Sequence, residues 1–338
     1  MEIHYQAPKV GAQPKSQEDR MNQSAAKIIA VTGATGAQGG GLIRAILAHP
    51  DGSFIARALT RDPESEKAQA LAALGVEVVK ADLDDEASLV AAFSGAYGAY
   101  CLTNFWEHFS PDKEIVQAGN LARAAKTAGV SHVIWSTLED VRDFVPLSDD
   151  RMPTLMEKYK VPHFDAKGES NHLFTDAGVP TTMLNTSFYW DNLIYFGMGP
   201  VAGEDGTLAI TFPLGDKKLA GIAAGDIGGR AYGVFAAGDK FIGETVSIAG
   251  GHLSGQEMAD SLTKALGKEV RYNAVSPDVY RSFGFPAADE LGNMFQFNAE
   301  FSDQYCAVRD LDVTRKLNPG LQSFDTWLAA NVSKIPLG

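Results

Sequence analysis

Three regularly spaced glycines are the first chemical signal in this sequence. Gly33, Gly36 and Gly39 follow the short apolar run at 27–32 and precede a segment with a helical pattern. A turn this tight between strand and helix needs positive φ, and a phosphate can approach the main chain only where no Cβ intervenes. A helix beginning near Gln38 would also direct unpaired N–H groups at that phosphate. The stretch predicts a dinucleotide-binding loop; the alternative is an ordinary tight turn.

The end of the second predicted strand indicates which dinucleotide is preferred. Sites that prefer NAD(H) usually carry an acid there, which binds the ribose 2′-hydroxyl. This chain has Thr60 and Arg61 instead, and an arginine pairs well with a 2′-phosphate. The neighbouring Asp62 has the position of a cap for a helix that Pro63 begins. We therefore predict NADP(H), in preference to NAD(H).

Polar and aromatic residues follow the next three predicted strands. Asp82 and Leu83 follow the third strand and have the position to line the adenine. Thr103, Asn104 and Phe105 follow the fourth strand, near the central ribose and the nicotinamide. Ser136 ends the fifth strand, beside the nicotinamide. Two alternatives stay open. Asp82 could cap the following helix, and Phe105 with Trp106 could be ordinary core packing.

A proton donor of the usual kind is missing. Short-chain dehydrogenases carry a Tyr-x-x-x-Lys pair, in which the tyrosine donates a proton and the lysine lowers its pKa. Lys167 has the expected place after the fifth predicted strand, but His163 stands four residues before it. The match formed by Tyr5 and Lys9 lies far upstream and is interrupted by Pro8. His163 could act as an acid itself or could simply form part of the pocket wall.

The segments around these residues alternate between strand and helix patterns. From Lys27 to about residue 140, short apolar runs alternate with stretches bounded by helix start and stop signals. This order predicts an α/β fold with a Rossmann-type doubly wound parallel sheet. We expect a flexible tail at 1–26, an NADP-binding domain at 27–186 and a smaller α/β domain at 187–338, with some exchange of chain between the two domains. The smaller domain should lie over the carboxyl ends of the strands.

The composition limits the partners and the compartment. The 338 residues include 29 Lys and Arg against 42 Asp and Glu, and the formal net charge of −13 disfavours direct binding of nucleic acid or an anionic membrane. No apolar stretch approaches the ~20 residues of a membrane span. The two cysteines are too few for a disulfide framework, and no signal-peptide pattern is present, so we expect a cytoplasmic protein. We expect no metal, because His163, Asp165 and Glu169 are scattered around a helix.

Motifs along most of the chain resemble the NmrA-like family, whose members are atypical relatives of the short-chain dehydrogenase/reductases. Between about residues 27 and 333 they come in this order: VTGATGAQGGG, LTRDPES, DLDD, TNFWE, WSTLEDV, HFDAKGE, SFYWDNL, GDIGGRAYGVF, SGQEMADSLTKAL, FPAADELGNMFQF and FDTWL. The motifs TNFWE and HFDAKGE are most similar to the NADPH redox-sensor branch of this family.

The resemblance implies a set of contacts with NADP(H). The residues are Gly33, Thr35, Gly36, Ala37, Gln38 and Gly39 for the pyrophosphate, Arg61 for the 2′-phosphate, Asp82 and Leu83 for the adenine, Thr103 and Asn104 for the ribose, Lys167 for the nicotinamide ribose, and Ser187, Phe188, Tyr189 and Trp190 closing over that end. In the last group the aromatic side chains are bulkier than the family pattern leads one to expect.

The resemblance also implies a redox sensor that reports the state of its cofactor to a regulatory protein partner, such as a transcription factor. Fungal relatives act in this way in nitrogen metabolite repression, which implies a nuclear as well as a cytoplasmic location; a homodimer is implied by family likeness alone. The retained Lys167 and the lost tyrosine favour this hypothesis. The alternative is an NADPH-dependent reductase of quinones or aromatic carbonyl compounds, with Lys167 or His163 as its catalytic group. A third hypothesis is a scaffold that has lost the cofactor.

Overall fold

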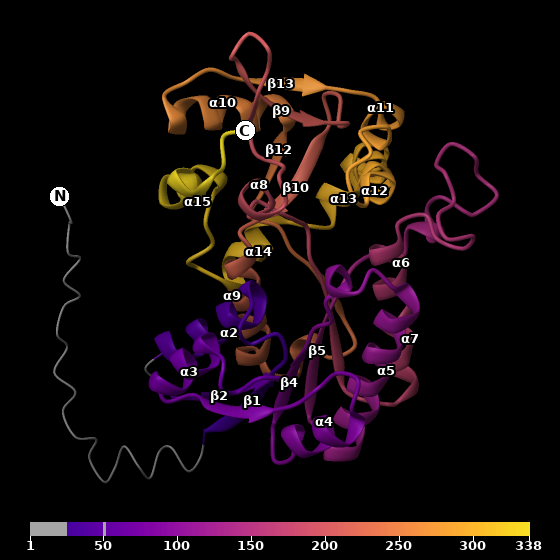
Figure 1. Cartoon of the computed structure of the whole chain (residues 1–338). Helices are drawn as coiled ribbons and strands as arrows, with labels where there is room; N and C mark the ends of the chain where they lie inside the picture. The colour runs from indigo at the N-terminus through magenta and orange to yellow at the C-terminus, as the bar shows by residue number, and fades with distance from the viewer. Residues whose placement is uncertain (1–25, 50–51) are drawn as a thin grey trace, which may run out of the picture.

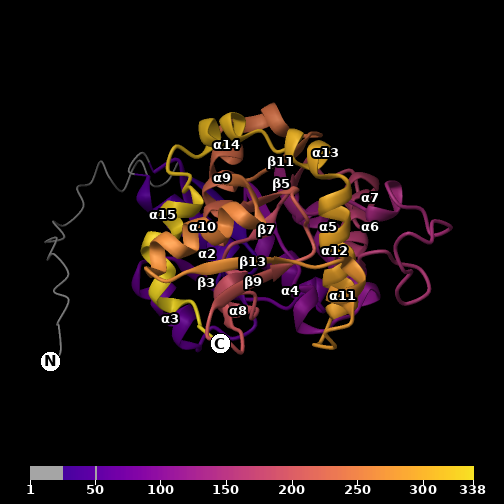
Figure 2. The same cartoon turned by 90° about the horizontal axis from the view of Figure 1, so that it is seen from above.

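The computed structural model describes residues 26–49 and 52–338, which form a lower and an upper part (Figure 1). The lower part is an open sheet with helices on both faces, and the upper part combines two small sheets with a group of helices. Seen from above, the upper part lies across the top of the lower one (Figure 2). The tail predicted for 1–26 lies, except for its last residue, outside the described residues.

The main sheet of the described residues has seven strands in the order β11-β6-β5-β4-β1-β2-β3, and every neighbouring pair is parallel. The strands are β1 (Lys27–Val31), β2 (Phe54–Thr60), β3 (Glu77–Lys80), β4 (Gly98–Cys101), β5 (His132–Thr137), β6 (Thr181–Asn185) and β11 (Thr245–Ser247). From β1 the chain first adds β2 and β3 on one side of the sheet and then crosses to add β4, β5 and β6 on the other side. The connections after β1 and β4 therefore diverge, which leaves a crevice at the carboxyl ends of these two strands. The predicted Rossmann-type fold is confirmed.

Helices cover both faces of the sheet. Successive apolar side chains of β1 point to opposite faces, so each face needs a layer of helices to bury them. Ile29 and Val31 belong to a core completed by α2 and α9, and Ala30 belongs to a second core completed by α4, α5 and α7. The helices of the lower part are α2 (Ala37–Ala48), α3 (Glu66–Ala73), α4 (Glu86–Phe93), α5 (Pro111–Ala128), α6 (Pro162–Glu169), α7 (Asn171–Asp176) and α9 (Ala224–Ala236).

Local start and stop signals set both ends of α5, whereas α3 departs from the prediction. Helix α5 begins where the Ser110 hydroxyl accepts the N–H of Lys113, and it ends at Gly129 in the left-handed region, φ 70°. The prediction that Pro63 begins a helix is wrong, because α3 starts at Glu66. The Asp62 carboxylate instead accepts the N–H of Glu64 and closes a turn before the helix.

Two elements from the second half of the chain complete the lower part. Strand β11 pairs with β6 at the edge of the main sheet, and α9 packs against α2. The two helices meet through glycines so closely that a Cβ on Gly228 would overlap the main chain of Gly41 and Leu42. The residues after 186 therefore contribute to both parts of the molecule.

The upper part is built around one apolar core between two three-stranded sheets and the surrounding helices. Its strands are β7 (Phe188–Tyr189), β8 (Val201–Ala202), β9 (Leu208–Phe212), β10 (Lys218–Ile222), β12 (Gly251–Ser254) and β13 (Val270–Ala274). Its helices are α8 (Asn192–Tyr195), α10 (Gly255–Leu266), α11 (Pro277–Arg281), α12 (Ala288–Glu300), α13 (Ser302–Ala307), α14 (Leu311–Leu317) and α15 (Phe324–Asn331). No helix in the described ranges has the length and apolar character needed to cross a bilayer.

Candidate functional site

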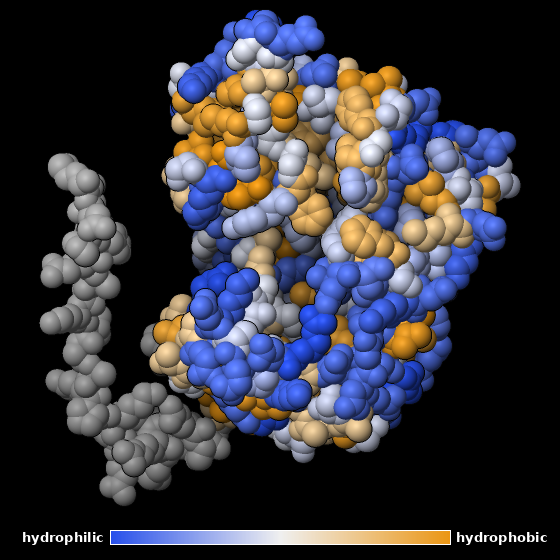
Figure 3. Space-filling view, in the orientation of Figure 1, coloured by the Kyte–Doolittle hydropathy of each residue, from blue (hydrophilic) through white to orange (hydrophobic). Residues whose placement is uncertain are grey.

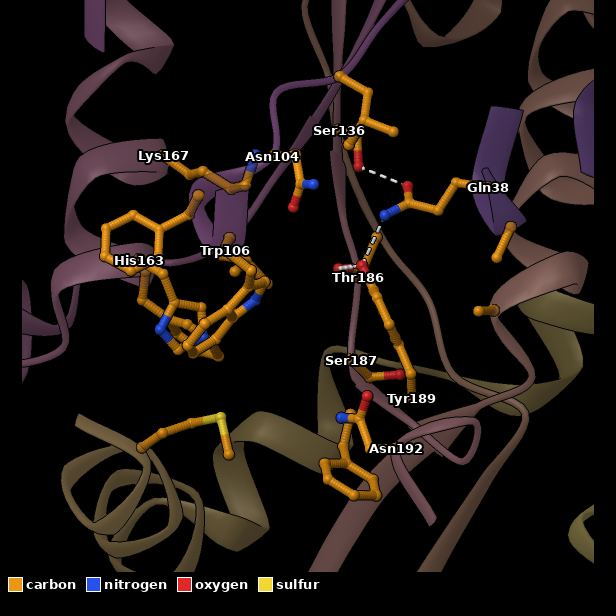
Figure 4. Close-up of a pocket in the computed structure, with 18 of the residues that line it drawn as sticks. Gln38, Asn104, Trp106, Ser136, His163, Lys167, Thr186, Ser187, Tyr189 and Asn192 are labelled. Carbon is orange, nitrogen blue, oxygen red and sulfur yellow. Dashed lines mark hydrogen bonds between the residues drawn. The ribbon is translucent and has the colours of Figure 1, made fainter. Parts of the chain in front are cut away.

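A pocket of about 470 Å³ lies where the carboxyl ends of β1, β4 and β5 meet the upper part. Figure 3 shows the surface hollowed between the two parts, and Figure 4 shows the lining side chains. The predicted site residues that line it are Gly33, Gly36, Ala37, Gln38, Thr103, Asn104, Phe105, Ser136, His163, Lys167, Ser187, Phe188 and Tyr189. The glycine loop, three strand ends and α6 thus meet around one space, as the order of the elements predicts.

The glycine loop has the features of a phosphate cradle. Gly33 has φ 60°, and a Cβ on Gly39 would lie 2.5 Å from the Gly33 carbonyl oxygen, so loop and helix depend on bare glycine at both positions. Helix α2 begins after Gly36 with no side-chain cap and no acidic residue in its first turn. Thr35 is half-buried in the same loop but does not line the pocket. The exposed, uncapped start of a twelve-residue helix fits a dinucleotide pyrophosphate.

The Gln38 side chain joins the loop to three neighbouring elements, and Figure 4 shows its bonds to Ser136 and Tyr189. Its carbonyl oxygen accepts hydrogen bonds from Tyr100 at 2.6 Å and Ser136 at 2.9 Å. Its amide donates to the Tyr189 hydroxyl at 2.6 Å, which also contacts the Thr186 hydroxyl at 3.3 Å. This network fixes the floor of the pocket beneath the helix start.

The predicted adenosine-binding residues lie outside the pocket, around the ends of β2 and β3. The Arg61 side chain is 64% exposed, and its guanidinium forms an ion pair with Glu107, which follows β4. Thr60 contacts the main chain of Asp62 through its hydroxyl. Arg61 is therefore accessible to a phosphate but already has a carboxylate partner.

The two residues after β3 are held by local bonds. The Asp82 carboxylate accepts the N–H of Asp84, and the Leu83 carbonyl accepts the amide of Asn120. The alternative that Asp82 caps the next helix is wrong, because Asp85 caps α4.

Lys167 is tied into a buried ion pair that the sequence analysis missed. Its ammonium lies 2.8 Å from the Glu114 carboxylate and donates to the Thr103 hydroxyl at 2.8 Å. Thr103 in turn donates to Glu114 at 2.7 Å, and Glu114 is completely buried. Glu114 comes from α5, 53 positions before Lys167 in the chain, and no motif links the two. The cluster holds Lys167 at the edge of the pocket with its charge compensated.

His163 is held by a second buried acid. The Nδ1 atom lies 2.6 Å from the Glu290 carboxylate, and the same oxygen accepts the main-chain N–H of His163 at 2.7 Å. The imidazole ring packs against Trp106, with ring centroids 4.8 Å apart, and against Phe105 at 5.9 Å. Glu290 comes from α12 of the upper part and gave no signal in the sequence.

The carboxylate of Asp165, two residues after His163, is bonded to the main chain. The Asp165 carboxylate accepts the main-chain N–H groups of Val141, Lys160 and Val161, and burial raises its pKa to about 6. In residues 26–49 and 52–338, no three His, Cys, Asp or Glu side chains converge as metal ligands would. Asp165 instead fastens the start of α6 to the segment after β5.

The aromatic residues predicted to close over the nicotinamide take different positions. Tyr189 lines the pocket and brings a phenol to it, but burial raises the pKa of that phenol to about 12. The expectation that Trp190 also closes over the site is wrong. Trp190 follows β7, and its side chain is 1% exposed and packs in the upper core against Phe324 and Trp327 of α15.

The far end of the pocket is apolar and aromatic. It is lined by Trp106, Phe196 and Met198 and by Leu291 and Met294 of α12. Trp106 and Phe196 meet edge to face, with ring centroids 5.6 Å apart. The pocket therefore has a polar end beside the glycine loop and an apolar end beneath the upper part, which suits a flat hydrophobic molecule.

Comparisons with known proteins agree with this fold. The sequence profile of the NmrA-like family matches residues 25–328. The "NmrA-like family domain-containing oxidoreductase FrzB" of Cladobotryum sp is 28% identical over 299 residues, which cover 83% of this chain and 86% of the relative.

Solved structures share the same architecture. NmrA, a negative transcriptional regulator solved in complex with NADP, aligns with a TM-score of 0.73 at 24% identity, covering 90% of this chain and 95% of NmrA. The NADPH-dependent quinone oxidoreductase QOR2 from Escherichia coli aligns with a TM-score of 0.66 at 28% identity, covering 90% and 98% of the two chains. At 24% identity the likeness to NmrA shows a shared fold.

Proposed function

Because this chain belongs to the NmrA-like family, we propose that it is an NADP(H)-dependent oxidoreductase that reduces a flat aromatic carbonyl compound such as a quinone. The two-ended pocket is the observation that carries this proposal. Its glycine-loop end has the uncapped helix start that suits a pyrophosphate, and its other end has an apolar volume walled by Trp106, Phe196 and Met294. FrzB and QOR2, both named as oxidoreductases, add support.

The chain's own residues have distinct parts in this reaction. Gly33, Gly36 and Ala37 would bind the pyrophosphate. The Lys167 ammonium, held by its ion pair with Glu114, would bind the nicotinamide ribose. When bound, NADPH would supply a hydride at its nicotinamide ring. The aromatic walls would orient a planar substrate over that ring and keep water away from it.

The preference for NADP(H) over NAD(H) depends in this proposal on Arg61. We expect Arg61→Ala to weaken NADPH binding roughly 10- to 100-fold, because it removes a charge-assisted partner of the 2′-phosphate. NADH binding should change less than twofold. Glu107→Gln should strengthen NADPH binding several-fold, since the competing carboxylate of the ion pair is gone. Calorimetric titration with both cofactors measures these effects, and an equal loss for NADPH and NADH in Arg61→Ala would contradict the assignment.

Turnover tests the proposed activity directly. The protein should oxidise NADPH in the presence of 1,4-naphthoquinone at more than about 1 s⁻¹, within the usual range of enzymes. Trp106→Ala should raise KM for the quinone about tenfold, because it removes one aromatic wall, while the Kd for NADPH stays unchanged. Absorbance at 340 nm follows the reaction, and NADPH oxidation without quinone is the blank.

The redox-sensor hypothesis remains a second candidate, and three observations favour it. The Lys167 charge is already compensated by Glu114, and burial raises the pKa of the Tyr189 phenol instead of lowering it. The ion pair of Arg61 with Glu107 also joins the predicted 2′-phosphate site to the short helix η1 (Phe105–Glu107). A sensor would bind NADPH tightly, would show turnover far below 1 s⁻¹ with every quinone, and would bind a regulatory protein partner differently with NADPH and NADP⁺.

A further inference from the structure

We propose that His163 donates the proton that completes carbonyl reduction in this pocket, and that Glu290 positions the imidazole for that step. The inference rests on the proposed reductase function and adds the catalytic group that the missing tyrosine leaves unassigned. His163 stands on α6, one helical turn before Lys167, so its side chain lies on the same wall of the pocket (Figure 4).

Glu290 fixes the orientation of the ring. One carboxylate oxygen of Glu290 lies 2.6 Å from Nδ1 and 2.7 Å from the main-chain nitrogen of His163. Because Glu290 is 5% exposed and His163 is 7% exposed, this pair is shielded from bulk water. A carboxylate on Nδ1 holds the proton on that nitrogen and leaves Nε2 as the atom that can pass a proton to a substrate.

His163 lines the pocket, and Nε2 is the ring nitrogen that the bond to Glu290 leaves open. Among the described residues it has no hydrogen-bond partner, yet it is not sealed off, unlike Nε2 of His108, which is buried. Trp106 and Phe105 pack on the imidazole and restrict its rotation. The ring therefore presents one nitrogen to Glu290 and the other to the space at the apolar end, where a substrate carbonyl would lie.

The other candidate donors in the pocket are less suited to this step. The Tyr189 hydroxyl accepts from Gln38, and burial raises its pKa to about 12, which makes it a weak acid. The Lys167 ammonium is engaged by Glu114 and Thr103. Among the described residues that line the pocket, His163 alone combines an orienting carboxylate with an open nitrogen.

The step balances with NADPH as the reductant. The hydride forms a C–H bond at the carbonyl carbon, and the electron pair of the C=O π bond moves to oxygen. The N–H bond at Nε2 breaks as the O–H bond forms, which gives the alcohol, or the hydroquinone after tautomerisation of a quinone. NADP⁺ and a neutral imidazole with its proton on Nδ1 remain, and the ring recovers a proton from water.

Removal and rescue of the imidazole test the proposal. His163→Ala should lower kcat with 1,4-naphthoquinone about a hundredfold or more, as expected for loss of a general acid, while the Kd for NADPH changes less than twofold. Added imidazole should restore at least a tenth of the lost activity, because it can enter the space that the side chain leaves. His172→Ala, an exposed histidine in α7, is the matched control and should behave like wild type in both measurements.

Glu290 is tested by a readout that does not depend on turnover. In ¹⁵N spectra of the cofactor-free protein, neutral His163 should carry its proton on Nδ1. Glu290→Leu, which removes the acceptor of both hydrogen bonds, should abolish this fixed tautomer and lower kcat about tenfold. Glu300→Leu, at the other end of α12, should change neither. If the wild type turns over and His163→Ala is fully active, this inference is wrong but the proposed reductase function is not. A neutral His163 ring with its proton on Nε2 would have the same consequence. Absence of turnover in the wild type would overturn both.

Discussion

Gly36→Asp should reduce the affinity for NADPH about a thousandfold while the protein stays folded. The substitution places a carboxylate at the start of α2, where the pyrophosphate is expected. Two like charges about 4 Å apart repel each other by ~4 kcal/mol at an effective dielectric constant of ~20, which corresponds to about three orders of magnitude in Kd. The protein should stay folded, because Gly36 has φ −94° and aspartate is a better cap than glycine for a helix that lacks one. A Cβ there would lie 3.2 Å from the Gly33 carbonyl oxygen, so the loop must shift slightly.

A matched variant separates charge from size in this experiment. Gly36→Asn has nearly the same shape and the same capping ability without the charge, so it should weaken NADPH binding by no more than about tenfold. Fluorescence titration gives the two Kd values, and thermal unfolding confirms that neither variant is destabilised. Equal affinities of Gly36→Asp and Gly36→Asn would show that the pyrophosphate does not lie at this helix start.

Gly228→Ala should destabilise the whole lower part. A Cβ at this position would overlap the main chain of Gly41 and Leu42, so α9 and α2 could no longer meet. Forced separation of packed helices typically costs about 3 kcal/mol, and this contact is tighter than most. A chain of this size should then unfold roughly 5–10 °C lower. Because α2 carries the phosphate cradle, the Kd for NADPH should rise as well.

Gly225→Ala is the control on the same helix. The nearest atom to a Cβ there is the end of the Arg44 side chain at 3.3 Å, which can move away. This variant should unfold within ~1–2 °C of the wild type, because alanine also favours the helix. Equal melting temperatures of Gly228→Ala and the wild type would contradict the close packing of α2 and α9. Differential scanning calorimetry, with and without NADPH, makes the comparison.

Local patterns in the sequence were sufficient for the sheet and for the polar end of the pocket. Helix ends such as Ser110 and Gly129, and the glycines after β1, depend on residues a few positions apart. The carboxyl ends of parallel strands share one edge of a sheet, so Thr103 and Ser136 could be assigned to one site before their distances were known.

The residues that could not be predicted are long-range partners. Glu114 reaches Lys167 from another helix, and Glu290 reaches His163 across 127 positions of chain. A buried carboxylate has no sequence pattern that distinguishes it from a solvated one, so its partner is visible only in three dimensions. Trp190 was misplaced for the same reason, because its partners Phe324 and Trp327 come from α15, far along the chain.

The late position of α9 and β11 in the chain affects how the protein can be made. When a ribosome has released β1 to β6, the exposed edge of β6 and the glycine face of α2 still lack the segments that cover them. Those segments are synthesised only after residue 223, following the first strands of the upper part. During synthesis the lower part therefore has an unpaired edge at β6 until α9 and β11 are made. This state favours chaperone binding over early independent folding.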